Sequence, residues 1–547
     1  MLSRYIVLYF FCCQFFIGFE GFSQQKKYFI EFIDKKNSPY SLSKPLEFLS
    51  QRSIDRRERQ SIALSERDLP VNPVYIQQIR QLGAVIWYSS RWMNGVLLEA
   101  DASTLDQITK LAFVKPVTDE NRLNNRLLIP ENRSGKIEAT KQTATIDYGS
   151  ATRQNRMLGI DKMHEVGFAG KDVHIAVMDG GFYQANAMNV FGHLYENQQL
   201  LGTYDFVRKQ ENVYDRSSHG SEVLSVIAAN SPGTMVGPAY DASFWLLRTE
   251  NEDSEYRLEE VNWLIAAEFA DSVGVDIINT SLGYNYFDDA SMDYLPEQMD
   301  GKTALITRAA NMAAATGMLV VVSAGNEGSS WWRTLSAPAD ADSVLAVAAV
   351  DNSELRASFS SIGKIIGGST IKPNVAAQGV GTVVMTPSNS LGTDNGTSLA
   401  TPLITGLAAG LWQAFPDLTN MQLLDFIQRS GSQAERPDTL LGYGVPDFTI
   451  VSELIRKETD PNAPIGYLSP NPVTSNEVML RVNITHLDKP INIEFFDVQG
   501  RRIYTHTIAN PVSENSVRIS PDIFRMGLYI VKIYNSDSQV VTRLVRL

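Results

Sequence analysis

Cysteine is nearly absent from this 547-residue sequence. Its only two cysteines, Cys12 and Cys13, lie together near the first residue, inside an apolar segment. If that segment is removed on export, the mature chain has no disulfide, no cysteine nucleophile and no thiolate metal site. A chain of this length can still fold, because it is long enough to bury several hydrophobic cores.

The sequence also has no excess of positive charge and few histidines. Its 48 lysines and arginines stand against 61 acidic residues, which gives a net charge of −13. This sign of charge repels phosphate backbones and anionic lipids, so we expect no nucleic-acid partner. Only six histidines are present, so each one in a site-like setting deserves notice.

The first residues are typical of an export signal. Arg4 precedes an apolar run over 5–19, and the small residues Gly21 and Ser23 follow it. The run is shorter than the roughly 20 residues that a membrane-spanning helix needs, so residues 1–23 are predicted to be a cleaved signal peptide. A buried N-terminal helix is the alternative. Because no later run of 18 apolar residues exists, we expect the mature protein to be soluble.

Residues 24–120 are predicted to form a small α+β unit. The order of expected elements is β-α-β-β-α-β, which matches a ferredoxin-like arrangement. The expected strands and helices are 27–33, 73–82 (helix), 84–88, 96–99, 102–111 (helix) and 113–117. An arginine-rich stretch over 52–67 shows no clear element. Residues 121–150 are polar and aperiodic, and are predicted to be a linker open to proteolysis.

The pattern changes over residues 151–455. Apolar, β-rich runs alternate with helical stretches, and this predicts a parallel sheet covered by helices on both faces. The clearest of these runs are 173–178, 277–279, 318–323 and 344–350. A short linker over 456–464 separates this unit from residues 465–547, which are predicted to form a small all-β sandwich. Its expected strands are 480–484, 491–497, 502–507, 516–519, 528–534 and 540–545.

Three polar residues stand at the ends of buried elements in the middle unit. Asp179 follows a buried strand and precedes two glycines, His219 begins a helix, and Ser398 lies at the start of another helix among small residues. Taken singly, each has an ordinary structural interpretation as a turn residue, a structural histidine or a helix N-cap. Taken together they predict nucleophilic catalysis, because a serine attacks only when a base removes its proton.

In this hypothesis, the roles follow from side-chain chemistry. His219 is the base that deprotonates Ser398, and Asp179 holds the imidazole and stabilises its charged form. Asn326 follows a further buried strand and is placed to donate to the oxyanion, together with the Ser398 backbone N–H.

These segments resemble the subtilisin-like serine proteases, the subtilases. The residues Asp, His and Ser occur in that family's chain order, within DGG, HGSEV, SAGNEG and GTSLATP. The resemblance covers about 157–450 and implies a subtilisin-like fold. It also implies that Ser281, Leu282 and Gly283 pair with an extended substrate and that Ser323, Ala324 and Gly325 form a wall of the specificity pocket.

Two positions depart from the family pattern. Gly180 stands where a serine or threonine usually follows the aspartate, and Glu222 replaces a second histidine. Neither position belongs to the proton-transfer set. A carboxylate at Glu222 changes the surroundings of His219, so the pH optimum does not follow from the motifs.

The flanking units carry further resemblances. Residues 24–120 resemble the inhibitory propeptides of subtilases, which implies that the chain's own propeptide is a partner; a permanent accessory domain is the alternative. Residues 465–547 resemble the sorting domains of type IX secretion cargo in Bacteroidota, through segments such as LSPNPV, FDVQGR and MGLYIV. This implies an outer-membrane secretion partner and export through the periplasm to the surface or medium. A generic β-sandwich that binds sugar or protein is the alternative.

No metal or cofactor motif is present. The sequence has no HExxH segment, so catalytic zinc is not expected. Five carboxylates could hold a structural calcium ion, but their spacing matches no calcium loop and a solvated acidic loop is favoured. These residues are Asp288, Asp289, Asp293, Glu297 and Asp300.

The sequence as a whole favours a secreted serine endopeptidase that acts on peptides or proteins and requires no cofactor. One alternative is a catalytically inactive, protease-like binding module at the cell surface. An esterase is disfavoured because Ser398 is not in a GxSxG segment and the chain order of the three residues is wrong for that fold.

Overall fold

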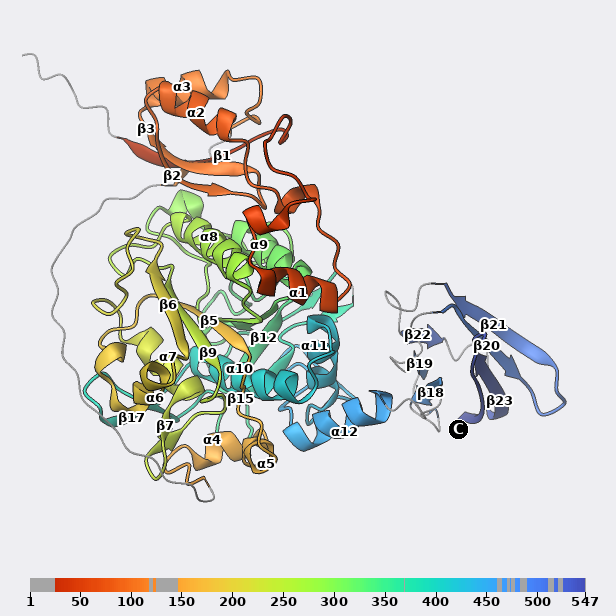
Figure 1. The fold of residues 1–547 in the computed structure, drawn as a ribbon. Coiled ribbons are helices and arrows are strands. Elements are labelled where there is room, and N and C mark those ends of the chain that lie inside the picture. The colour runs from red at the N-terminus through yellow and green to blue at the C-terminus, as the bar shows by residue number, and fades with distance from the viewer. Residues whose placement is uncertain are drawn as a thin grey trace, which may run out of the picture.

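A computed structural model shows three units in chain order (Figure 1). The structure describes residues 25–117, 122–123, 146–367, 369–459, 465–469, 473, 478–482, 489–509, 516–519 and 525–546. The predicted signal peptide and most of the predicted linker over 121–150 lie outside the described residues. Within the described residues, no helix has the length and apolar character that a membrane crossing requires.

The first unit is a four-stranded sheet with the strand order β2-β3-β1-β4. Its strands are β1 (Lys26–Glu31), β2 (Val85–Ser90), β3 (Gly95–Ala100) and β4 (Arg122–Leu123), and its covering helices are α2 (Pro73–Gln81) and α3 (Ala102–Thr109). Asp101 is the N-cap of α3, since its carboxylate accepts a hydrogen bond from the Thr104 N–H. The α+β order is therefore as expected.

Two details of this unit differ from expectation. The predicted strand over 113–117 is wrong: only Val114 makes an isolated bridge, to Phe32, and the fourth strand is β4. The arginine-rich stretch contains a helix, α1 (Gln51–Arg59), which Ser50 caps. Sequence periodicity did not reveal α1 because the face that it buries carries arginines rather than apolar side chains.

The middle unit is built on seven parallel strands in the order β15-β12-β11-β10-β5-β9-β6. The strands are β5 (His174–Asp179), β6 (Leu200–Asp205), β9 (Ser243–Arg248), β10 (Ile277–Thr280), β11 (Leu319–Ser323), β12 (Leu345–Val350) and β15 (Val375–Gln378). The predicted parallel sheet is confirmed. It also contains β6, β9 and β15, which were not singled out.

Alternate residues of each central strand enter different cores, as the two-residue period of a strand requires. Ile175 and Val177 pack in the core beneath α7 (His219–Ala228) and α10 (Thr397–Ala414). Ala176 and Met178 pack in the core beneath α8 (Leu258–Val273) and α9 (Leu305–Ala315). The sheet is therefore buried on both faces.

Shorter elements complete this unit. They are α4 (Thr152–Arg156), α5 (Ile160–Glu165), α6 (Gly192–Glu196), α11 (Asn420–Arg429), α12 (Phe448–Thr459), β7 (Asn230–Ser231), β8 (Met235–Val236), β13 (Ile365–Ile366), β14 (Thr370–Ile371), β16 (Thr382–Met385) and β17 (Leu391–Asp394). Helix α12 extends into the predicted linker over 456–464. Residues 456–459 of that linker are therefore helical.

The third unit consists of two antiparallel sheets that share one apolar core. Its strands are β18 (Gly466–Ser469), β19 (Val478–Val482), β20 (Ile491–Phe496), β21 (Arg502–Ile508), β22 (Ser516–Ile519), β23 (Gly527–Tyr534) and β24 (Gln539–Arg546). The predicted all-β sandwich is confirmed, with β18 as an additional strand.

The first unit lies directly on the second (Figure 1). One face of its sheet is covered by α2 and α3; the other face contributes Phe29 and Leu97, and the β2–β3 turn contributes Trp92, to the apolar cluster around α8 and α9. The Tyr88 hydroxyl also donates to the Phe206 carbonyl at 2.9 Å. The two units therefore share apolar core as well as polar contacts.

Candidate active site

The carboxyl ends of neighbouring strands bring the predicted site residues to one edge of the sheet. Strand β5 ends at Asp179, Ser281 follows β10, and Asn326 follows β11. These three strands are adjacent and parallel, so their ends meet where ligand-binding groups of open α/β sheets gather. His219 and Ser398 reach the same edge from the first turns of α7 and α10.

Asp179 and His219 form a hydrogen-bonded pair. His219 Nδ1 lies 2.9 Å from Asp179 Oδ1 and 3.1 Å from Oδ2, and the Gly180 N–H donates to Oδ1 at 2.8 Å. A carboxylate only accepts hydrogen bonds, so Nδ1 carries the proton in this pair. In a neutral imidazole, Nε2 then has a free lone pair and is the atom that can accept a proton.

Glycine at position 220 permits this close approach. A Cβ atom at Gly220 would lie 2.2 Å from the Gly181 carbonyl oxygen and 2.9 Å from Asp179 Cβ. Both distances are far below contact distance, so no larger residue fits between α7 and the end of β5. The glycine that follows the histidine in the HGSEV segment therefore has a steric explanation.

Opposing effects set the pKa of His219. Burial lowers this pKa, but the charge of Asp179, its hydrogen bond, and the charges of Glu250 and Glu222 raise it, with a net increase to about 9. Glu222 lies one turn further along α7, and burial raises its own pKa. The departure from the family pattern at Glu222 therefore acts on the imidazole through charge.

The backbone carbonyl of Ser398 is left without its helical hydrogen bond by Pro402, and another residue donates to it. In a regular helix the N–H of residue 402 would donate to the Ser398 carbonyl, but Pro402 has no N–H. The hydroxyl of Ser281 donates to that carbonyl instead, at 2.8 Å. Ser398 lies in the first turn of α10, where free backbone N–H groups favour negative charge.

Asn326 is oriented by Thr397, the residue before the serine. The Thr397 N–H and hydroxyl donate to Asn326 Oδ1 at 2.9 and 3.0 Å, which leaves Nδ2 as a donor. A Cβ atom at Gly396 would lie 2.7 Å from Ser398 Oγ and 3.7 Å from Asn326 Nδ2. The serine hydroxyl and the amide donor therefore border the same small space.

The contact between Ser398 and His219 is less complete than the contact between Asp179 and His219. Among the described residues, no hydrogen bond joins the His219 ring to Ser398 Oγ, and the His219 side chain is 36% exposed. Catalytic hydrogen bonds of free enzymes are often long and shorten when substrate binds. The lack of this hydrogen bond therefore does not exclude the pair from proton transfer.

The two predicted substrate segments lie side by side. Ser323 Oγ donates to the Leu282 carbonyl at 3.2 Å, and the Gly325 N–H donates to Thr397 Oγ1 at 3.2 Å. Ser281 and Ala324 are largely buried. The side chain of Ser281 supports the serine segment, a function that the sequence analysis missed; Pro402, four residues after Ser398, was the available signal.

The acidic loop near residue 290 forms turns. The carboxylates of Asp288, Asp289, Asp293 and Asp300 accept hydrogen bonds from backbone N–H groups nearby. In the part of the chain that the structure describes, no group of three or more histidine, cysteine or acidic side chains is arranged to hold a metal ion.

The fold and the residues at its carboxyl edge define an α/β protein of the subtilisin-like class. Residues 170–444, half of the chain, match the model of the Subtilase family, and the chain belongs to that family. Residues 27–137 match the Peptidase S8 propeptide domain of Bacteroidota, and residues 468–546 match the secretion system C-terminal sorting domain. The sorting-domain match indicates export to the cell surface or the extracellular space.

Two subtilisins are among the relatives of this chain. The chain is 34% identical over 275 residues to Subtilisin NAT of Bacillus subtilis subsp. natto, which is 49% of this chain and 63% of that relative. It is 31% identical over 282 residues to Subtilisin DY of Bacillus licheniformis, 51% and 89% of the two chains. A solved cold-adapted subtilisin-like serine proteinase matches with a TM-score of 0.40 and 22% identity, over 51% and 90%.

Proposed function

We propose that this chain is a secreted serine endopeptidase in which Asp179, His219 and Ser398 form the catalytic triad. The observation that carries the proposal is the Asp179–His219 hydrogen bond, at 2.9 Å, at the sheet edge that also holds the first turn of α10. A buried carboxylate on one imidazole nitrogen prepares the other nitrogen to act as a base. Membership of the subtilase family supports the same assignment.

The reaction follows from the positions of these groups. His219 Nε2 takes the proton of Ser398 Oγ while that oxygen attacks the scissile carbonyl carbon. Asn326 Nδ2 and the Ser398 backbone N–H donate to the oxyanion that forms. His219 then gives its proton to the leaving amine, and a water molecule, deprotonated by the same imidazole, releases the acyl group from Ser398.

A fluorophosphonate probe tests the proposal directly, because it reacts covalently with an activated serine. We expect labelling of the processed protein at Ser398 and none in Ser398→Ala. Absence of labelling in the unsubstituted, processed protein would favour the non-catalytic binding module instead.

The Asn326→Leu substitution is expected to lower kcat by about 10²- to 10³-fold with a small change in KM. The amide donates to an oxyanion that exists only in the transition state, and leucine is similar in size but donates nothing. Steady-state kinetics on one peptide substrate measure both constants. Asn352→Leu, in an exposed turn, is the control; an equal loss of activity in both variants would contradict the oxyanion role.

The activity is expected to rise with pH up to about pH 9. His219 must be neutral to act as a base, and its pKa is raised to about 9. Below that value kcat/KM is expected to increase about tenfold per pH unit, and to level off above it. Glu222→Gln removes one of the charges that raise this pKa, so its profile is expected to lie at lower pH. An unshifted profile would contradict the electrostatic role of Glu222.

We also propose a role for each of the three units of the chain. Residues 24–120 act as an inhibitory propeptide that is cut off within 121–150, residues 151–455 are the catalytic domain, and residues 465–547 are recognised by the outer-membrane secretion machinery. The matches to a propeptide domain and to a sorting domain support this division. Cleavage of peptide bonds in proteins other than the chain itself is part of the same proposal.

A further inference from the structure

Helix α1 lies at the amino edge of the seven-stranded sheet, away from the candidate catalytic residues. Its Arg52 forms an ion pair with Asp276, which directly precedes β10. The Asp276 carboxylate in turn accepts the N–H of His174, the first residue of β5, at 2.9 Å. Asp179 ends the same strand, five residues or about 16 Å further on. Helix α1 therefore cannot act by filling the active site.

The contact between α1 and α8 is a buried cluster of charges. Asp271 of α8 is fully buried and accepts hydrogen bonds from Arg56, from Arg57 at 2.8 and 2.9 Å, and from Arg91 at 2.5 Å. Arg57 also binds Asp68 at 2.9 Å. Burial raises the pKa of Asp271, but the three guanidinium groups outweigh it and hold this pKa well below its usual range.

Helix α1 also supplies partners to the ends of other helices. Arg56 Nε donates to the Thr316 carbonyl at 3.1 Å, just beyond the end of α9, where a cation is favoured by the helix dipole. Gln60 Nε2 donates to the Gly317 carbonyl at 2.8 Å. Gln60 Oε1 accepts the N–H of Asn420, the first residue of α11, at 2.9 Å. Two helices of the catalytic domain, α9 and α11, therefore end or begin beside α1 and the residue that follows it.

The turn between β2 and β3 adds to the same surface. Glu268, one turn before Asp271 on α8, accepts hydrogen bonds from the Ser90 hydroxyl at 2.5 Å and from the Arg91 and Trp92 N–H groups at 2.9 and 3.1 Å. Each of these bonds joins the N-terminal unit to the catalytic domain.

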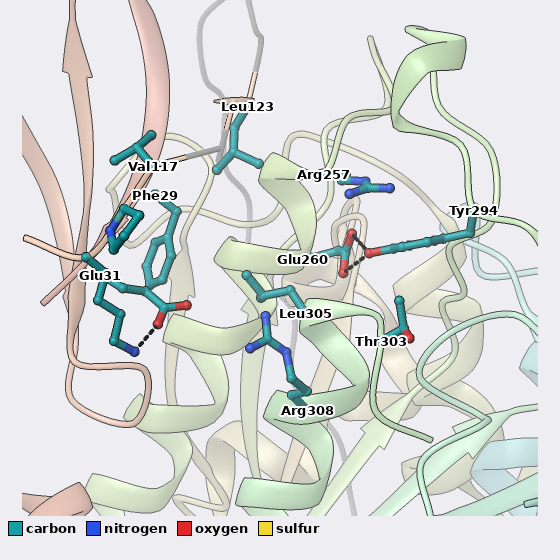
Figure 2. Close-up of a pocket in the computed structure, with 12 residues that line it drawn as sticks. Phe29, Glu31, Val117, Leu123, Arg257, Glu260, Tyr294, Thr303, Leu305 and Arg308 are labelled. Carbon is teal, nitrogen blue, oxygen red and sulfur yellow. Dashed lines mark hydrogen bonds and ion pairs between the residues drawn. The ribbon is translucent and has the colours of Figure 1, made fainter. Parts of the chain in front are cut away.

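The opposite ends of α8 and α9 are packed less tightly. Residues of both units line a cavity of about 280 Å³ there (Figure 2). Its polar groups pair within their own unit: Lys115 binds Glu31 at 2.7 Å, and the Tyr294 hydroxyl donates to Glu260 at 2.8 Å. Cross-unit charge pairing is thus concentrated at the α1 end.

We propose that Glu268, Asp271 and Asp276 form a docking surface for α1 and the β2–β3 turn, and that the ion pairs of this surface with Arg52, Arg56, Arg57 and Arg91 set how slowly the N-terminal unit dissociates once the chain is cut. The proposal rests on the proposed function only in treating residues 24–120 as a removable propeptide. Removing one partner of a buried, hydrogen-bonded ion pair leaves the other charge uncompensated, so loss of a single charge here is expected to weaken the binding of the two units strongly. The processed enzyme is an acidic receptor for an arginine-bearing helix.

The test uses the full Ser398→Ala chain, so that the enzyme does not cut itself. A recognition sequence for an unrelated, site-specific protease is inserted within residues 124–145 and cut. Dissociation of the fluorescently labelled N-terminal unit is then followed after dilution. Asp271→Asn is expected to speed dissociation about 100-fold or more. Tyr88→Phe, which removes one neutral hydrogen bond at the sheet, is expected to change the rate about tenfold at most.

Two further variants keep the test decisive. Arg57→Met alters only the N-terminal unit and is expected to speed dissociation less than Asp271→Asn, because Arg56 and Arg91 still pair with Asp271. The double variant is expected to fall short of the product of the two single effects, because each substitution removes the Arg57–Asp271 pair. If Asp271→Asn does not fold, Arg57→Met gives the result. If the N-terminal unit dissociates from either folded variant as slowly as from the unsubstituted chain, the proposed docking surface is wrong. Fluorophosphonate labelling of the serine-containing chain reports the proposed function independently.

Discussion

Replacing Ser398 with alanine is expected to lower kcat on the order of 10⁶-fold, a magnitude known for the nucleophile of a subtilisin. Without Oγ, His219 has no hydroxyl to deprotonate and no acyl-enzyme forms. The fold is expected to survive, because Ser398 Oγ makes no hydrogen bond to another described residue and its loss leaves no partner unsatisfied. The Ser398 carbonyl that Ser281 binds is unchanged by the substitution.

Initial rates of peptide hydrolysis by equally purified proteins measure this loss. Ser358→Ala, at an exposed serine, is the matched control and is expected to keep full activity. Retention of more than about 1% of the activity by Ser398→Ala would contradict the assignment of the nucleophile. N-terminal sequencing of both secreted proteins adds a separate result: processing that is unchanged in Ser398→Ala would defeat self-maturation but not peptidase activity.

Asp179→Asn is expected to lower kcat on the order of 10⁴-fold, the loss known for this substitution in a serine protease triad. The substitution conserves shape, and the amide oxygen can still accept the Gly180 N–H. The amide NH₂ then faces His219 Nδ1, which must become the acceptor, so the proton moves to Nε2 and the base is lost. Steady-state kinetics above pH 9 measure the effect with the imidazole neutral.

Thermal unfolding of the same preparation is the control for Asp179→Asn. Asp179 is fully buried, so an activity loss with an unfolding temperature far below that of the parent would report misfolding. A folded variant with less than a tenfold loss would contradict the role of Asp179 in fixing the tautomer.

The sequence predicted those parts of the fold and site that depend on local pattern. Buried parallel strands are continuous apolar runs, and Asp179 and Asn326 became candidate site residues because polar residues and glycine interrupt such runs at the sheet edge. The donation from Ser281 to the Ser398 carbonyl was not predictable in this way. It joins residues 117 positions apart, and only the packed sheet and helix bring them together.

Helix α1 was missed for a related reason. Methods that rest on periodicity expect a buried helix face to be apolar, whereas the buried face of α1 carries Arg56 and Arg57. These side chains are buried only because Asp271 compensates their charge. The error over 113–117 has another origin: residues 113–115 lie beside the end of β1, but the contact is limited to one bridge, and the regular pairing on that edge is made by β4 with Lys27 and Tyr28.

The core that the N-terminal unit shares with the catalytic domain has a consequence for the solution behaviour of the enzyme. Phe29, Trp92 and Leu97 lie against α8 and α9. Dissociation of the N-terminal unit therefore exposes to solvent an apolar helix surface that was buried. Uncovered patches of this kind favour self-association in water. Acidic residues outnumber basic ones over 151–547, so mutual repulsion opposes such clustering, and added salt weakens that repulsion.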